Sequence, residues 1–218
     1  MKITPRVIWM SLAIVLLALA ACFLMVGYWP ALGHLVGLGG PRDLGVTFTE
    51  SDYTSAHDKL FGADDPLHVS DTFTDAEMSA LLNSCTGGAC LLSDVQVRTG
   101  SNDRVMVSGS IQKDKILEAL ATNGVDPALS SVLQYLPTEA PFYAEVEVQG
   151  QDDVLVLELM TAQLSGLGMP DEVLREINAE LSQSLNEYLA TLPGTQITNI
   201  NVQNGSIQLN ADLSEIQL

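Results

Sequence analysis

Basic residues are scarce in this chain. Its 218 residues include nine lysines and arginines against 27 aspartates and glutamates, for a net charge of −18. Lys2 and Arg6 precede the first apolar run, and every acidic residue lies at or after Asp43, so the chain beyond Trp29 carries seven basic against 27 acidic residues. Such a charge repels nucleic acid and anionic lipid head groups. The composition therefore argues against a nucleic-acid partner. The simplest interpretation of the acidic surface is that it keeps the domain soluble.

Catalytic and nucleotide-binding motifs are lacking as well. The sequence holds no G-x-S-x-G, H-E-x-x-H, G-x-x-x-x-G-K-S/T or G-x-G-x-x-G. The three histidines, His34, His57 and His68, show no metal-ligand spacing. Glu145 and Glu147 stand two apart on a predicted strand, which is typical of a solvated face and only weakly suggestive of paired-carboxylate chemistry. We predict no enzyme activity, no metal site and no cofactor.

Cysteine is nearly absent, because only Cys22, Cys85 and Cys90 occur. Cys85 and Cys90 enclose Thr-Gly-Gly-Ala, a loop tight enough to bring the two residues within bridging distance. In an oxidising compartment a disulfide is the favoured interpretation, and two free thiols beside a flexible turn are the alternative. The spacing is not the C-x-x-C of redox sites, and two thiols alone fall short of a zinc site.

What the chain does contain is one long apolar run. Residues 7–29 carry no charge, and as a helix they would span about 34 Å, enough to cross a bilayer with some tilt. Lys2 and Arg6 before the run orient the N-terminus toward the cytoplasm. The predicted organisation is a cytoplasmic tail over 1–6, a transmembrane helix over 7–29, a Gly/Pro-rich linker over 30–45 and an acidic extracytoplasmic domain over 46–218.

Two alternatives use the same apolar run. Ala18-Leu19-Ala20 resembles a small-residue cleavage site, and Leu19-Ala20-Ala21-Cys22 resembles a bacterial lipobox in which Cys22 is lipidated. The sequence stays apolar after Cys22, which favours an uncleaved anchor. All three interpretations place the domain outside the cytoplasm.

Helix-start signals recur along the domain. Phe48-Thr49 and Phe73-Thr74 each combine an N-cap threonine with an acidic residue three positions later, which is a capping box. They predict helices over 50–61 and 75–84. Other helices are predicted over 113–121 and 126–136, and the longest one follows Pro170 and ends before Pro193, with its leucines and isoleucine stepping by three or four.

Period-two alternation predicts three hairpins. They turn at 100–103, at 150–153 and at Asn204-Gly205. The strand from Val154 to Met160 is apolar at nearly every position, which predicts burial on both faces. The fold class is therefore α+β: an antiparallel sheet of about six strands with one wet face, packed by about five helices, the last one long.

The order of these segments resembles a known group of proteins. The segments are 73–82, the hairpin over 95–109, 141–148, 164–170 leading into the long helix, and 200–209. The order is similar to the YpmS-like and LmeA-like groups of small anchored envelope proteins of Gram-positive and related bacteria. The LmeA-like group is linked to tubular lipid-binding folds, in which a curved sheet wraps a long helix and an apolar ligand sits between them. The resemblance implies this architecture and assigns no residue as a ligand contact.

Two functions are compatible with these observations. The first is a non-catalytic, membrane-anchored envelope protein that acts as a scaffold or regulator through protein contacts. The alternative, implied by the resemblance, is a binding module for a lipid or another apolar ligand. The expected partners are the membrane and either a lipid or another envelope protein.

Overall fold

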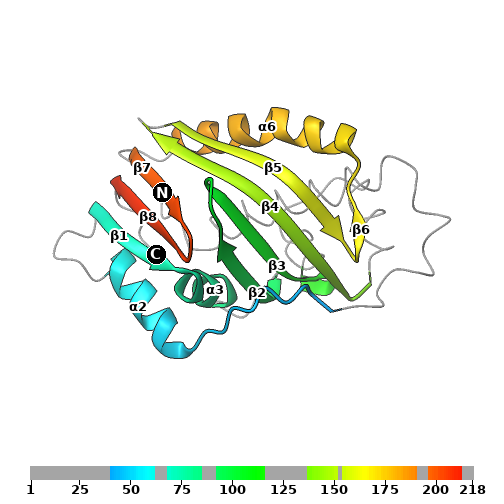
Figure 1. The fold of residues 1–218 in the computed structure, drawn as a ribbon, viewed down its shortest axis with the longest axis horizontal. Helices are drawn as coiled ribbons and strands as arrows, with labels where there is room; N and C mark the ends of the chain where they lie inside the picture. Colours follow the sequence, from blue (N-terminus) through cyan, green and yellow to red (C-terminus); the bar gives the residue numbers. More distant parts are fainter. Residues whose placement is uncertain are drawn as a thin grey trace.

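A computed structural model of the chain describes residues 40–61, 68–84, 92–115, 137–151, 154–190 and 196–212. Its strands form one curled antiparallel sheet with helices beside it, which confirms an α+β fold (Figure 1). The elements are α2 (Glu50–Phe61), β1 (His68–Thr74), α3 (Asp75–Asn83), β2 (Leu92–Thr99), β3 (Arg104–Gln112), β4 (Glu139–Gln151), β5 (Val154–Leu164), β6 (Leu167–Gly168), α6 (Asp171–Ala190), β7 (Gln196–Gln203) and β8 (Ser206–Asp212).

The predicted anchor lies outside the described residues, together with the tail over 1–6 and Cys22. Within the part of the chain that the structure describes, no helix is long and apolar enough to cross a membrane. Most of the predicted helix over 113–121 and all of the one over 126–136 also fall outside the description.

Of the two predicted capping boxes, the one at α3 forms both reciprocal bonds, and the one at α2 forms only the bond from the Thr49 amide to Asp52. At the start of α3, the Glu77 amide donates to the Thr74 hydroxyl, and the Thr74 amide donates back to the Glu77 carboxylate at 2.8 Å. At the start of α2, the amide and hydroxyl of Thr49 both donate to the Asp52 carboxylate at 2.7 Å. Each interaction satisfies backbone groups that a helix end leaves unpaired. The predicted starts of both helices are confirmed.

Strand β4 is the longest strand and joins the two halves of the sheet. Its residues from Phe142 onward pair with β5 along one edge. Along the other edge β3 pairs with β4 as far as Glu147, and β7 then pairs with Gly150 and Gln151. Beyond β3 lies β2, and beyond β7 lie β8 and β1. The described sheet has eight strands where about six were predicted, because β1 and the two-residue β6 carry no clear alternation.

Strand β5 corrects one prediction. The run from Val154 to Met160 was expected to be buried on both faces, yet its exposure alternates: Leu155 and Leu159 are buried, whereas Val154, Val156 and Met160 are exposed. The buried face packs against α6. Burial on both faces requires a second covering layer, and the described residues place none over the outer face of β5.

A second correction concerns Tyr143, which stands two residues before Glu145 and so shares the strand face on which Glu145 and Glu147 predict solvent. This side chain is buried, because the segment before α2 crosses that face and stacks the Arg42 guanidinium 4.4 Å from the ring centre. Leu44 of the same segment is also buried, and its amide donates to the Gln96 side chain at 2.7 Å. Arg98 in turn donates to the Leu44 carbonyl. The end of the predicted linker is therefore bound to the outer face of the sheet.

Helix α3 covers the outer edge of β2 with a ladder of polar side chains. Four helical residues rise about 6 Å and two strand residues about 6.6 Å, so side chains at i, i+4 and i+8 can follow alternate backbone amides. These amides would otherwise form an exposed edge. The Thr99, Val97 and Val95 amides donate to Asp75 Oδ1 (3.0 Å), Ser79 Oγ (2.8 Å) and Asn83 Oδ1 (2.9 Å).

Helix α6 covers the outer edge of β5 in the same way. Asn178 accepts from the Leu159 amide at 2.8 Å and donates to its carbonyl at 3.1 Å. Eight residues later on α6, Asn186 accepts from the Leu155 amide and donates to the Leu155 carbonyl. Figure 1 shows α6 running alongside β5 at this edge. Side-chain amides thus replace the next strand, which protects the edge from pairing with another chain.

The apolar core lies on the inner face of the curled sheet. One cluster joins β2, β3 and β4 to Val202 of β7, and a second joins β4 and β5 to the inner face of α6. A third, smaller cluster holds α2 against β1 through Ala56, Val69 and Phe73. The outer face consequently supplies the accessible surface on which a site can be built.

Candidate functional site

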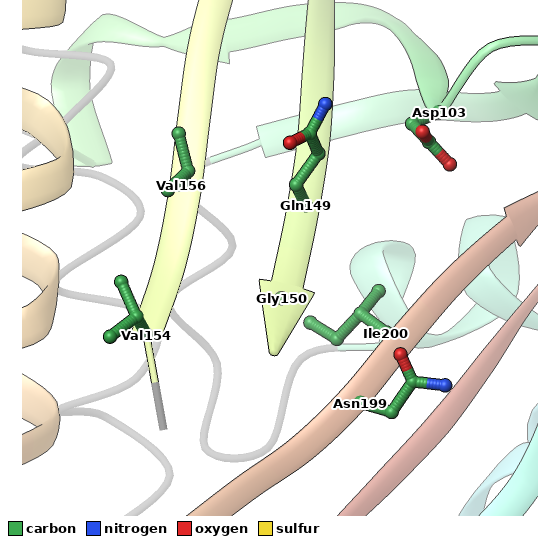
Figure 2. A pocket seen from close by; sticks show the side chains of 7 residues that line it. All are labelled: Asp103, Gln149, Gly150, Val154, Val156, Asn199 and Ile200. Carbon is green, nitrogen blue, oxygen red and sulfur yellow. The ribbon is translucent and has the colours of Figure 1, made fainter. Parts of the chain in front are cut away.

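A groove of about 470 Å³ opens on the sheet between the start of β3 and the middle of β7 (Figure 2). Strand β4 continues past the start of β3, and β7 reaches it only at Gly150 and Gln151. The groove is the gap along β4 between its last pair with β3 and its first pair with β7. Its lining residues are Asp103, Gln149, Gly150, Val154, Val156, Asn199 and Ile200.

The turn between β2 and β3 forms one wall of the groove. Asn102 and Asp103 both adopt positive φ, at 60° and 57°, a conformation that these two residue types tolerate better than most. The Gly100 amide closes the turn onto the Arg104 carbonyl at 2.8 Å. The Asp103 carbonyl accepts from the Val148 amide at 2.8 Å, which ties the turn to β4 and holds the Asp103 side chain at the rim.

The floor of the groove depends on a glycine. Gly150 pairs with Ile200 across the junction of β4 and β7. A Cβ atom at residue 150 would stand 3.0 Å from Ile200 Cγ1, closer than side chains normally approach. The missing side chain therefore lets β7 come close to β4 and lets Ile200 fill the floor.

The opposite wall is apolar and belongs to β5. Val154 and Val156 are 53% and 46% exposed, and Met160, further along the same strand, is 39% exposed. Val156 pairs with Gln149 across the two strands, so both side chains lie on the outer face. The sequence held a signal for this arrangement, because Glu158 interrupts the apolar run at a position that shares its face with Val154 and Val156.

The groove lining is suited to contact with another molecule. It combines one carboxylate, two side-chain amides and three branched apolar side chains. Paired-carboxylate chemistry requires a second acid across the reacting bond, and this lining supplies only Asp103. In the described part of the chain no group of three or more His, Cys, Asp or Glu side chains could hold a metal ion. The arrangement can bury apolar groups and can hydrogen-bond a polypeptide.

The residues singled out from the sequence lie elsewhere. Cys22, Cys85 and Cys90 fall outside the described residues, so the disulfide and lipidation hypotheses stay predictions. His57 is exposed on α2, and the ring of His68 lies 2.7 Å from the Asp212 carboxylate on the neighbouring strand. Neither histidine lines the groove.

The predicted pair Glu145 and Glu147 does share the outer face of β4. Glu147 stands two residues before Gln149, which lines the groove. Glu145 accepts a hydrogen bond from Arg104 at 2.9 Å, and Glu147 accepts one from Gln149 at 2.8 Å. Burial raises the pKa of Tyr143; the Arg42 charge opposes this effect, and the nearby Glu145 carboxylate reinforces it. These contacts hold the outer face of the sheet together.

The most strongly perturbed acid, Glu77, is structural. Lys59 of α2 donates to both of its carboxylate oxygens, at 2.6 and 2.8 Å, and Ser55 adds a third hydrogen bond. Burial raises the pKa of Glu77, but the bonds from Lys59, Ser55 and the Thr74 amide, with the Lys59 charge, outweigh burial and lower the pKa from 4.5 to about 2. The group stays ionised and clamps α2 to α3.

Comparison with known proteins adds no assignment for this site. No family model matches the chain, and no curated protein matches it. The groove and the exposed face of β5 therefore have to be interpreted from their own geometry.

Proposed function

We propose that this chain is a single-pass, membrane-anchored extracytoplasmic envelope protein without catalytic activity, which acts as a scaffold or regulator through protein contacts. The observation that carries the proposal is the row of exposed side chains on β5, in which Val154 and Val156 line the groove and Met160 follows beyond Glu158. Clustered apolar side chains rimmed by polar groups are typical of interaction sites.

The packing beneath these side chains makes β5 a rigid surface for recognition. The opposite face of β5 packs against Val173 and Ile177 of α6, and its edge is bonded to Asn178 and Asn186. A contact surface held on a strand in this way needs little reordering when a partner binds. The edges of β2 and β5 are occupied by helix side chains, so a partner would meet the face of the sheet and would not add a strand there.

Photo-cross-linking in cells that express the full chain tests the proposal. A photoreactive phenylalanine analogue replaces Val156, and the matched control places the same analogue at Glu176, which is exposed on α6. We expect a discrete adduct with another envelope protein at position 156 and none at position 176, and the reciprocal cross-link from that protein back to this chain. The absence of an adduct at 156, or equal adducts at both positions, would overturn the proposal.

The same cells test the anchor and the alternative function. External protease should remove the domain while a cytoplasmic marker survives, and the mass of the intact chain should retain residues 1–21. Organic extraction of the purified chain should release no stoichiometric lipid. A stoichiometric lipid would instead support the alternative, a binding module for a lipid or another apolar ligand.

A further inference from the structure

We propose that the outer face formed by β4 and β5 recognises a polypeptide segment that presents apolar side chains flanked by lysine or arginine. This inference rests on the proposed function and specifies the chemistry of the partner. The surface consists of the exposed side chains Val154, Val156 and Met160, the carboxylates Glu147 and Glu158, and the groove rim at Asp103. We call it the β5 face.

The carboxylates of the β5 face are arranged unfavourably in the free protein. Glu147 and Glu158 are directly paired across β4 and β5, so their side chains lie side by side on one surface. Like charges at such positions destabilise a strand pair. Arg104 pairs with Glu147 on the other side, but its guanidinium donates to Glu145. No salt bridge within the described residues joins Glu158 or Asp103 to a cation.

A cationic side chain placed between the two carboxylates would relieve this repulsion. The row of exposed apolar side chains runs along the same strand, so a basic group and an apolar group of one partner segment can engage the surface together. The groove beside Val154 and Val156 is large enough to receive an apolar side chain, and its amide groups, on Gln149 and Asn199, can bond the partner backbone. Anchors of this kind dominate the energy of protein interfaces.

Charge also excludes two other occupants. A second copy of the chain docked face to face would bring the Glu147 and Glu158 carboxylates of both copies together, and like charges across an interface oppose association. An anionic bilayer surface would be repelled by the same groups and by the net charge of −18. A basic polypeptide is the remaining partner that gains from both the apolar and the acidic groups.

Charge reversal combined with the cross-link at position 156 tests this inference. Glu158→Lys changes the β5 face, and Glu176→Lys on the exposed side of α6 is the matched control with the same change in net charge. Glu158→Lys replaces a like-charged pair by an opposite pair, so the fold should be retained, and a thermal melt of the full chain in detergent checks this. We expect the adduct yield at 156 to fall at least tenfold with Glu158→Lys and to stay within twofold with Glu176→Lys.

The partner itself supplies the second readout. Mass spectrometry of the adduct should place the cross-linked residue within a few positions of a lysine or arginine. Equal yields from the two charge variants, or a cross-linked segment without basic residues, would overturn the inference while the proposed function stands. An adduct of twice the chain mass, or one with lipid, would overturn the inference in favour of a second copy or a bilayer. If the parent chain gives no adduct at all, the proposed function fails with it.

Discussion

Replacement of Asn178 by alanine should destabilise the domain by more than its partial exposure suggests. This side chain, on α6, accepts a hydrogen bond from the Leu159 amide and donates one to the Leu159 carbonyl. Leu159 is only 3% exposed, so water cannot readily replace the lost partner. The substitution leaves one donor and one acceptor of the sheet edge unsatisfied.

The expected loss follows from these two groups. A buried polar group left without a partner costs about 1–3 kcal/mol, so the two groups together cost roughly 2–6 kcal/mol. Alanine is a better helix former than asparagine by about 0.5 kcal/mol, which offsets a small part. A net loss of about 1.5–5.5 kcal/mol is a large fraction of the roughly 5–15 kcal/mol that holds a typical domain folded.

Urea denaturation of the full chain in mild detergent, followed by far-ultraviolet circular dichroism, measures this loss. Glu176→Ala, on the exposed side of the same helix, is the control and should change the free energy of unfolding by less than about 0.5 kcal/mol. Hydrogen exchange adds a local readout: the Leu159 amide should exchange faster in Asn178→Ala, and the Leu155 amide, which donates to Asn186, should change less.

A third variant separates the hydrogen bonds from side-chain volume. Asn178→Asp keeps an acceptor for the Leu159 amide but sets a carboxylate against the Leu159 carbonyl. Its deficit relative to the parent should shrink at low pH, where a protonated aspartate can donate again. The explanation is wrong if Asn178→Ala is as stable as Glu176→Ala and the Leu159 amide keeps its protection.

Three further predictions address other parts of the fold. The pKa of Glu77 is lower in the folded state than its ordinary 4.5, so its ionisation contributes about 3 kcal/mol of stability. This contribution is present above pH 4.5 and is lost as the pH falls toward 2. Urea midpoints of Glu77→Gln should therefore depend less on acid pH than those of the parent. Gly109→Ala puts a Cβ 3.1 Å from the Ser93 carbonyl oxygen and should cost about 1–3 kcal/mol, whereas Gly168→Ala meets no atom within 4 Å, so equal melting temperatures would contradict the packing argument. Thr99→Val removes a hydroxyl that donates to Asp75 and accepts from the Gly205 amide, both at 2.7 Å; the Gly205 amide should lose protection in hydrogen exchange, and unchanged protection would refute this role.

The elements that could be predicted from the sequence are those with local causes. Helix α2 begins and ends where its capping signal and apolar spacing place it, over residues 50–61. The turn at Asn204-Gly205 joins β7 to β8 as predicted, with Gly205 at a positive φ of 95°. In each case residues within one turn of the chain supply the stabilising contacts, so neighbouring sequence is sufficient.

The errors arose where distant segments decide burial. The apolar run from Val154 to Met160 predicts two covered faces, but α6 covers one face only, and Glu158 is the single residue of the run that marks the exposed face. Tyr143 follows the polar alternation of its strand, yet it is buried under Arg42, about a hundred residues earlier in the chain. Strand β1 has a mostly polar sequence and becomes a strand through its pairing with β8.

The sequence by itself determined the charge of this protein, its helix starts, its tight turns and the α+β class, because composition and short-range spacing carry these properties. Only the tertiary structure decided the candidate site. The groove exists because β3 and β7 share one edge of β4 and leave a step between Asp103 and Asn199, residues that are far apart in the chain. The exposed valines beside it are a consequence of a sheet with one covered face, and that arrangement is a property of packing.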